Sequence, residues 1–205
     1  MKPLLLALAM LAADPAPEPD PAAIDVADAI ACKLDAPTYT GFALALASGG
    51  PDAPDAKKGW HKVDSHNPYM NEYALPAPIT VAGHYSTSHI GFTASGVVAI
   101  LDLPDPAVIA QEEGIANSMD AEPLIDSLVA AGKGTRAEIE KKLTFRKFLG
   151  NKVVAEHRIP PAAGESFGLH TTITREISNV STAPGKTLYG CSYSQEITDK
   201  DGKPL

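Results

Sequence analysis

Hydrophobic and polar positions alternate with a period of two over three long segments of the chain. These segments are residues 79–103, 167–181 and 186–198, and such alternation is typical of strands that bury one face. We expect the last two to form one long hairpin joined by Thr182–Gly185. The segment 79–103 predicts a second hairpin.

The remaining non-helical segments are less regular. Residues 38–47, TYTGFALALA, predict a strand, and the Gly-, Pro- and Asp-rich residues 49–59 predict a loop. Residues 60–73 are polar and aromatic without a clear period, so we expect mostly irregular structure. A further strand is expected from about Leu143, with Gly150–Asn151 as the hairpin turn that leads into KVVAEHRI.

Helical signals occur in two groups. Residues 22–34 place small and apolar residues on one stripe and predict the first helix. Residues 105–115 predict a short helix, with Asp105 as its N-cap, Pro106 at its first helical position and Gly114 near its end. Residues 122–134 predict another, and Thr135 with Glu138 forms a capping box for a third that ends before the strand at Leu143.

Because the strands mostly follow one another as hairpins and the helices are grouped, the pattern predicts an α+β fold. We expect a single domain over residues 22–205, with a mainly antiparallel β-sheet built from hairpins and about three to four helices packed on one face. A chain of this length is sufficient for one hydrophobic core.

The N-terminal residues are typical of an export signal. Lys2 precedes an apolar run that is too short to cross a bilayer, and we interpret residues 1–13 as a signal peptide. The Pro-, Asp- and Glu-rich residues 14–21 predict an extended, disordered leader. The mature protein is therefore expected to be periplasmic or secreted. No other segment is apolar enough to predict a transmembrane span.

The acidic charge argues against a nucleic-acid partner. The formal net charge is −8, and it becomes −9 once Lys2 leaves with the signal peptide. The chain has two cysteines, and an exported protein folds in an oxidising compartment, so we expect a Cys32–Cys191 disulfide. Alternation in the last strand places Tyr189, Cys191 and Tyr193 together on a core face.

Histidines in GHYSTSHIGF form the candidate metal site. If residues 85–88 form a four-residue hairpin loop, His84 and His89 lie directly opposite each other, with Cβ atoms about 5 Å apart. Zinc normally requires three or four protein ligands. His170 is the candidate third ligand, and His61, Asp64 and His66 are alternatives; two exposed, titrating histidines are the simpler interpretation.

Aromatic and polar residues in the segment 60–73 form a candidate ligand-binding site. Trp60, His61, His66 and Tyr69 lie in a predicted loop, and loops on a rigid sheet commonly carry binding groups. The alternative is that Trp60 and Tyr69 fill the edge of the core.

Two catalytic motifs are present only in part. Gly-Glu-Ser-Phe-Gly around Ser166 matches the G-x-S-x-G pattern, but a nucleophile elbow needs a strand before it and a helix after it. Here prolines precede the motif and a predicted strand follows. Residues 180–187, VSTAPGKT, end like a phosphate-binding loop but have valine in place of the first glycine. Both motifs are better interpreted as turns, so the chain has no predicted catalytic residue.

These patterns favour a non-catalytic exported protein of the cell envelope that binds a small molecule or another envelope protein. The alternative is a metal-binding protein or a metal-assisted hydrolase that uses His84, His89 and His170. No cofactor is predicted beyond a possible divalent metal in that alternative.

Overall fold

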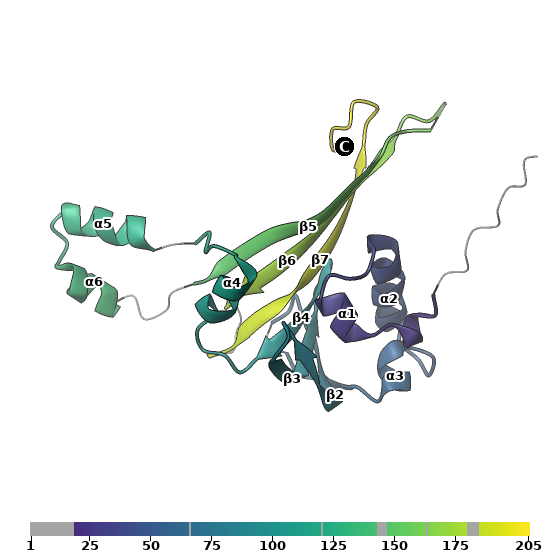
Figure 1. Cartoon of the computed structure of the whole chain (residues 1–205), viewed down its shortest axis with the longest axis horizontal. Coiled ribbons are helices and arrows are strands. Elements are labelled where there is room, and N and C mark those ends of the chain that lie inside the picture. Colours follow the sequence, from purple (N-terminus) through teal and green to yellow (C-terminus); the bar gives the residue numbers. More distant parts are fainter. Residues whose placement is uncertain (1–18, 66, 120, 143–146, 163, 180–184) are drawn as a thin grey trace, which may run out of the picture.

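The computed structural model describes residues 19–65, 67–119, 121–142, 147–162, 164–179 and 185–205. One antiparallel sheet of seven strands, in the order β1-β2-β3-β4-β7-β6-β5, organises this part of the chain (Figure 1). Its strands are β1 His61–Val63, β2 Asn71–Val81, β3 Tyr85–Phe92, β4 Gly96–Leu101, β5 Leu149–Ile159, β6 Gly168–Ser178 and β7 Thr187–Thr198. The predicted α+β class is confirmed, and so is the long hairpin of β6 and β7.

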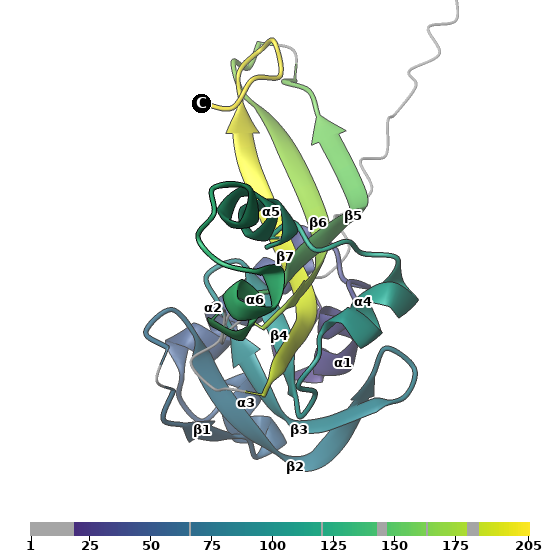
Figure 2. The same ribbon diagram turned by 90° about the vertical axis from the view of Figure 1, so that its left-hand side faces the viewer.

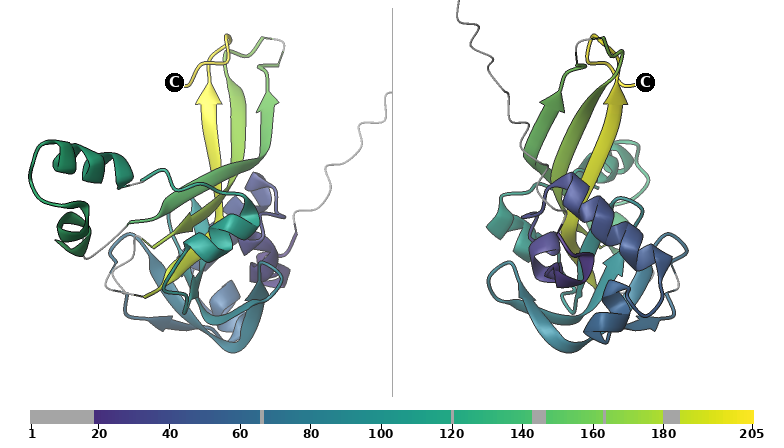
Figure 3. Two further views of the ribbon diagram at one scale, coloured as in Figure 1. Left: turned by 60° about the vertical axis from the view of Figure 1, so that its left-hand side comes forward. Right: turned by 90° about the vertical axis from the view of Figure 1, so that its right-hand side faces the viewer.

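Helices lie against one face of this sheet and also project away from it. They are a 3₁₀ turn at Pro21–Ala23, α1 Val26–Ile30, α2 Ala36–Ser48, α3 Pro54–Lys58, α4 Ala107–Glu113, α5 Glu122–Ala130 and α6 Arg136–Lys142. Helices α1 and α2 cross the face of β7, whereas α5 and α6 pair with each other and project from the opposite side (Figures 1 and 3). Strands β5, β6 and β7 extend beyond the helices as a three-stranded blade (Figure 2).

The main hydrophobic core lies between the sheet and helices α1, α2 and α4. Its largest fully buried side chains include Phe42 from α2, Ile30 from α1, Ile109 from α4 and Ile90 from β3. Burial of one such side chain is worth about 1.5–3 kcal/mol. Packing in this core therefore holds α1, α2 and α4 in place against the sheet.

Residues 38–47 were expected to form a strand, and that prediction is wrong because they belong to α2. The Asp35 side chain caps the helix by accepting a hydrogen bond from the Thr38 amide at 2.8 Å. Buried positions then recur at helical spacing, at Ala36, Tyr39, Phe42 and Leu46. The β-branched and aromatic residues suggested a strand, but the cap and the tertiary contacts determine a helix. The loop expected over residues 49–59 also contains α3.

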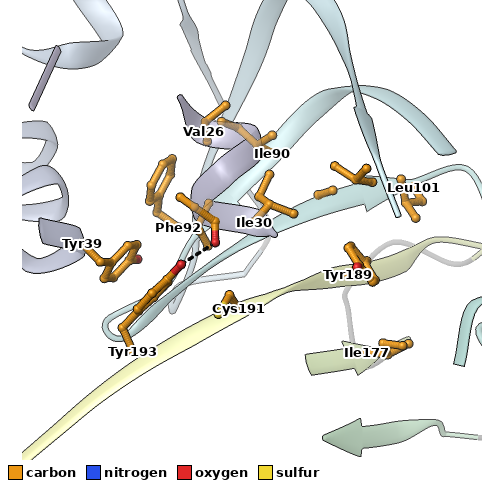
Figure 4. Packing of buried hydrophobic residues seen from close by; sticks show 14 of the residues in the cluster. Val26, Ile30, Tyr39, Ile90, Phe92, Leu101, Ile177, Tyr189, Cys191 and Tyr193 are labelled. Atoms are coloured by element: carbon orange, nitrogen blue, oxygen red, sulfur yellow. Dashed lines mark hydrogen bonds between the residues drawn. The ribbon is translucent and has the colours of Figure 1, made fainter. Parts of the chain in front are cut away.

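The first helix is shorter than predicted. Helix α1 ends at Ile30, and Cys32 has a left-handed backbone with φ of 59°, which turns the chain out of the helix. Cys32 and Cys191 form a disulfide, with Cα atoms 5.3 Å apart. The Tyr193 hydroxyl also donates to the Ala29 carbonyl at 2.7 Å (Figure 4). These two contacts attach the end of α1 to β7.

A buried arginine makes a further contact at the end of α1. Arg175 on β6 donates to the Ile30 carbonyl and, at 3.1 Å, to the Gly190 carbonyl. Its guanidinium lies 4.4 Å from the centre of the Tyr189 ring. A cation at the carbonyl end of a helix interacts favourably with the helix dipole, so Arg175 stabilises the position of α1 on the sheet.

The predicted helices after β4 are confirmed at α4, α5 and α6. Gly114 ends α4 in a left-handed conformation with φ of 65°. The Thr135 amide donates to Glu138 at 2.8 Å and the Glu138 amide donates to the Thr135 hydroxyl at 3.3 Å, which is the reciprocal pair of a capping box. The hydrogen bonds that the Glu138 carboxylate accepts from the amide and the hydroxyl of Thr135 lower its pKa.

The turn expected at Gly150–Asn151 is wrong, because both residues lie within β5. Gly150 serves close packing instead: a Cβ atom there would lie 2.5 Å from Ile115. Strand β5 pairs with β6 over its length, with an irregularity between Val153 and Ala155. Its outer edge is exposed from Asn151 onward.

Several expectations fall on residues outside those described. They are the signal peptide, most of the 14–21 leader, the strand start at Leu143 and most of the Thr182–Gly185 turn. No helix in the described part of the chain is both long and apolar enough to cross a membrane. A disulfide-bonded cysteine pair is compatible with a location outside the cytoplasm.

Candidate functional site

The hairpin that was expected to bring His84 and His89 together has a different register. The turn lies at residues 82–84, where Ala82 and Gly83 have φ of 45° and 80°, and Val81 pairs directly with Tyr85. Residues 85–88 therefore belong to β3 and form no loop. His84 lies in the turn, whereas His89 pairs with Ala74. The predicted opposition of the two histidines is wrong, because two residues with positive φ allow a tighter turn than the one assumed.

His84 lies beside helix α4 on the helix-bearing side. Its Nε2 is 3.7 Å from a Glu112 carboxylate oxygen, and its ring lies 4.2 Å from the Tyr85 ring. The Tyr85 hydroxyl donates to the same carboxylate at 3.1 Å. These exposed groups connect the β2–β3 turn to α4.

His89 lies in a different cluster. Its Nε2 is 3.0 Å from Glu72 Oε2, and the Ser65 hydroxyl donates to Glu72 Oε1 at 2.9 Å. The His89 contact has the distance of an ion pair without the alignment of a hydrogen bond. Because Ser65 donates to the carboxylate and not to the imidazole, this cluster lacks the direct serine–histidine hydrogen bond of a hydrolase triad. The cluster connects the loop after β1 to β2 and β3.

His170 lies on the blade, far from His89. Its Nε2 is 2.9 Å from Glu156 and its Nδ1 is 3.7 Å from Glu196. Hydrogen bonds from Arg158 and then from His170 lower the pKa of Glu156. His170 lies eight strand positions, roughly 26 Å, from Ser178 at the other end of β6, and strands β7 and β4 separate β6 from the strand that carries His89.

The three histidines predicted as metal ligands are thus in three separate places. Among the described residues, no group of three or more His, Cys, Asp or Glu side chains is arranged to hold a metal ion. Of the alternative third ligands, His61 is exposed at the start of β1, and His66 lies outside the described residues.

The candidate ligand-binding residues of segment 60–73 also separate. Trp60 is buried in the core, where its ring packs against Phe42, Tyr73 and Phe92. Tyr69 remains 84% exposed. The segment contains β1 and the start of β2, so it is more regular than expected. Trp60 therefore fills the core, as the alternative interpretation of this segment expected, whereas Tyr69 is exposed and available to a ligand.

Tyr69 borders a depression of about 890 Å³ that we call the neutral groove. The groove lies between α2, the loop before β2, the loop before β4 and the C-terminal half of β7. It is lined by Tyr39, Thr40, Ala43, Leu44, Ala47, Asn67, Pro68, Tyr69, Asn71, Phe92, Thr93, Ala94, Ser95, Tyr193, Ser194 and Gln195. Charged residues make up 20% of the chain, yet none of these lining residues carries a charge. Leu44 is 63% exposed and faces this space with Tyr69.

The groove also offers polar groups that have no partner. In the described part of the chain, the side chains of Asn71, Ser95, Ser194 and Gln195 make no hydrogen bond. The main chain of Tyr69 is held in place by the Asn67 side chain, which accepts a hydrogen bond from the Tyr69 amide at 3.0 Å. The groove thus combines apolar contact area with exposed, uncharged donors and acceptors that are available to a ligand.

Sequence reasoning did not find this groove. Its wall on α2 was hidden by the incorrect strand prediction, and Leu44 was assigned to a sheet. The Asp35 cap followed by Pro37 was the available signal for a helix. The approach of Gln195 to α2 depends on the fold and has no local signal.

The chain matches no protein-family model, no curated protein and no solved structure. Its function must therefore be argued from its own geometry.

Proposed function

We propose that this protein is an exported, non-catalytic binding module whose ligand occupies the neutral groove. The observation that carries the proposal is the groove itself: a large, uncharged depression with exposed Leu44 and Tyr69 and with exposed polar side chains along its walls. Binding sites for small molecules are typically concave, largely apolar and equipped with a few placed polar groups.

The surrounding structure supports a binding role. The groove is bordered by α2, which packs on the main core, and by β7, which pairs with β6 along its length. The disulfide joins β7 to the segment that leads into α2. A site built on such elements is largely preformed, which reduces the entropy lost on binding.

Catalysis has weaker support. Ser65 donates to the Glu72 carboxylate and not to a histidine, and Ser166 is exposed in the connection between two strands and is followed by no helix. The histidines of the metal-dependent alternative lie in separate clusters. We propose a periplasmic or secreted location from the N-terminal signal pattern and the disulfide, and an uncharged small molecule or an envelope component as the partner in preference to nucleic acid.

Nuclear magnetic resonance can test this proposal. The oxidised, ¹⁵N-labelled protein would be titrated with a mixture of small uncharged fragments that contain hydroxyl, amide and aromatic groups. We expect shifts of the backbone amides of residues 67, 69–71, 93–95 and 193–195, with those of α5 unchanged. Shifts at another surface, or none, would refute the groove as the binding site.

A charged residue in the groove provides the matched control. Leu44→Glu should abolish the shifts because an ionised carboxylate would have to lose water when a neutral ligand binds. Leu124→Glu makes the same change at a residue of α5 that is 53% exposed and lies outside the groove. It should leave the shifts unchanged.

A further inference from the structure

We infer that the ligand of the neutral groove is an uncharged saccharide chain, with Tyr69 as its stacking platform. This inference rests on the proposed binding function and specifies its ligand class. The chemistry of the lining residues carries it.

The absence of charge in the lining selects the ligand class. Anionic or cationic ligands are usually recognised by side chains of opposite charge, and the described lining residues include none. A saccharide instead presents many hydroxyl groups, each a donor and an acceptor. Amides and hydroxyls also offer both functions, and these are the exposed groups of Asn71, Ser95, Ser194 and Gln195.

Tyr69 has the properties of a stacking surface. Its ring is 84% exposed, although its backbone is held by the Asn67 side chain. An exposed tyrosine combines an apolar ring face with a polar hydroxyl. The apolar face of a sugar ring can stack on it while the sugar hydroxyls reach the polar walls.

The main chain of β7 adds one more anchor. The Tyr193 amide donates to the Ser95 carbonyl at 2.7 Å, and the Ile197 carbonyl accepts from the Leu205 amide at 3.1 Å. Alternate residues of a strand direct their N–H and C=O groups to the same side. Gln195 lies midway between them, so its N–H and C=O point into the same gap beside the groove.

The same contacts argue against an extended peptide that adds a strand to the sheet. Strand addition needs a run of free main-chain groups along an edge. Here Ser95 binds the Tyr193 amide and Leu205 binds the Ile197 carbonyl, so among the described residues the gap is left with the Tyr193 carbonyl, both main-chain groups of Gln195 and the Ile197 amide. These few groups can anchor sugar hydroxyls, whereas the two closed ends limit the length of any strand that could be added here.

Calorimetric titration of the full, oxidised protein can test the saccharide inference. The probes are neutral hexasaccharides of glucose and of N-acetylglucosamine, a sulfated hexasaccharide, and an uncharged decapeptide of Gly, Ser and Asn. We expect binding of at least one neutral saccharide, weaker binding of the sulfated one, and no binding of the peptide.

Two variants connect binding to the groove. Tyr69→Ala should weaken the affinity for the saccharide by about tenfold or more, as expected for loss of an aromatic anchor, and Gln195→Pro should weaken it by removing the main-chain donor. Phe167→Ala removes another exposed aromatic ring outside the groove, 58% exposed, and should leave the affinity unchanged. Melting curves of each variant will show that it is folded.

The outcomes separate the saccharide inference from the binding function. Peptide binding that Leu44→Glu abolishes, without saccharide binding, overturns the saccharide ligand and supports the groove. Saccharide binding that Tyr69→Ala does not weaken overturns the assigned platform. If no probe binds, the saccharide inference fails, and the fragment titration decides whether the groove binds other neutral molecules.

Discussion

Tyr39 and Tyr193 provide a test of how hydrogen bonding contributes to the stability of this protein. Their rings stack with centroids 4.2 Å apart and an interplanar angle of 12°, and both residues are buried (Figure 4). The Tyr193 hydroxyl donates to the Ala29 carbonyl at 2.7 Å, whereas the buried Tyr39 hydroxyl has no hydrogen-bond partner among the described residues. The same substitution, Tyr→Phe, should therefore have opposite effects at the two positions.

The magnitudes follow from what each variant leaves behind. Tyr193→Phe removes one hydrogen bond, but the Ala29 carbonyl still accepts from the Cys32 amide at 3.1 Å, so the loss is that of an ordinary bond, about 1 kcal/mol. Tyr39→Phe removes a polar group that was desolvated without compensation, and should raise the free energy of unfolding by about 1 kcal/mol or more. The two variants should differ by about 2 kcal/mol.

Chemical and thermal unfolding of the oxidised protein measure these changes. Each kcal/mol corresponds to a change in Tm of about 2–4 °C in a protein of this size. Tyr39→Phe should melt above the unsubstituted protein, and Tyr193→Phe below it. A Tyr39→Phe variant that is destabilised as much as Tyr193→Phe would refute the reasoning, because the Tyr39 hydroxyl would then have a stabilising partner. The double variant measures coupling between the stacked rings.

Four further predictions concern the disulfide, two glycines and the response to pH. Replacing Cys32 and Cys191 by alanine together should lower the unfolding free energy by up to about 5 kcal/mol, because the bridge closes a loop of 159 residues; an unchanged Tm without reductant would contradict this. Gly190→Ala should cost about 3 kcal/mol or more, since its Cβ would lie 2.1 Å from a carbonyl oxygen of β4. Gly41→Ala, on the open surface of α2, should instead stabilise by up to about 1 kcal/mol in denaturant titrations. Burial raises the pKa of Tyr193 to about 12, whereas in the unfolded chain it is near 10. The stability that the protonated hydroxyl contributes is therefore complete below about pH 10. This stability is lost as the pH rises toward 12, at up to about 1.4 kcal/mol per pH unit. Unfolding at pH 9 and pH 11 should show this loss, with a smaller loss in Tyr193→Phe.

Local patterns predicted those elements whose conformation is decided by neighbouring residues. The capping box of Thr135 and Glu138 and the Gly114 terminus were readable because their hydrogen bonds join residues within four positions. The alternation of β7 placed Tyr189 and Tyr193 on the core face because strand side chains alternate whatever the partner strand.

Predictions failed where distant residues decide between two local possibilities. Gly150 and Asn151 have the composition of a turn, but Ile115 packs against Gly150 and keeps the pair within β5. Ala82 and Gly83 fit the pattern of a strand, but in the structure both have positive φ and form the turn of the hairpin. That shift removed the pairing of the histidines and with it the predicted metal site.

The sequence by itself determined the α+β class, the two strands of the C-terminal hairpin, the helices after β4 and the absence of a complete catalytic motif. Each of these depends on periodicity or on contacts between residues close in the chain. Only the tertiary structure decided the register of β2 and β3, the helical state of α2 and the neutral groove. The groove brings Leu44, Tyr69 and Gln195 together from three distant segments, and such proximity arises from core packing, which no local pattern encodes.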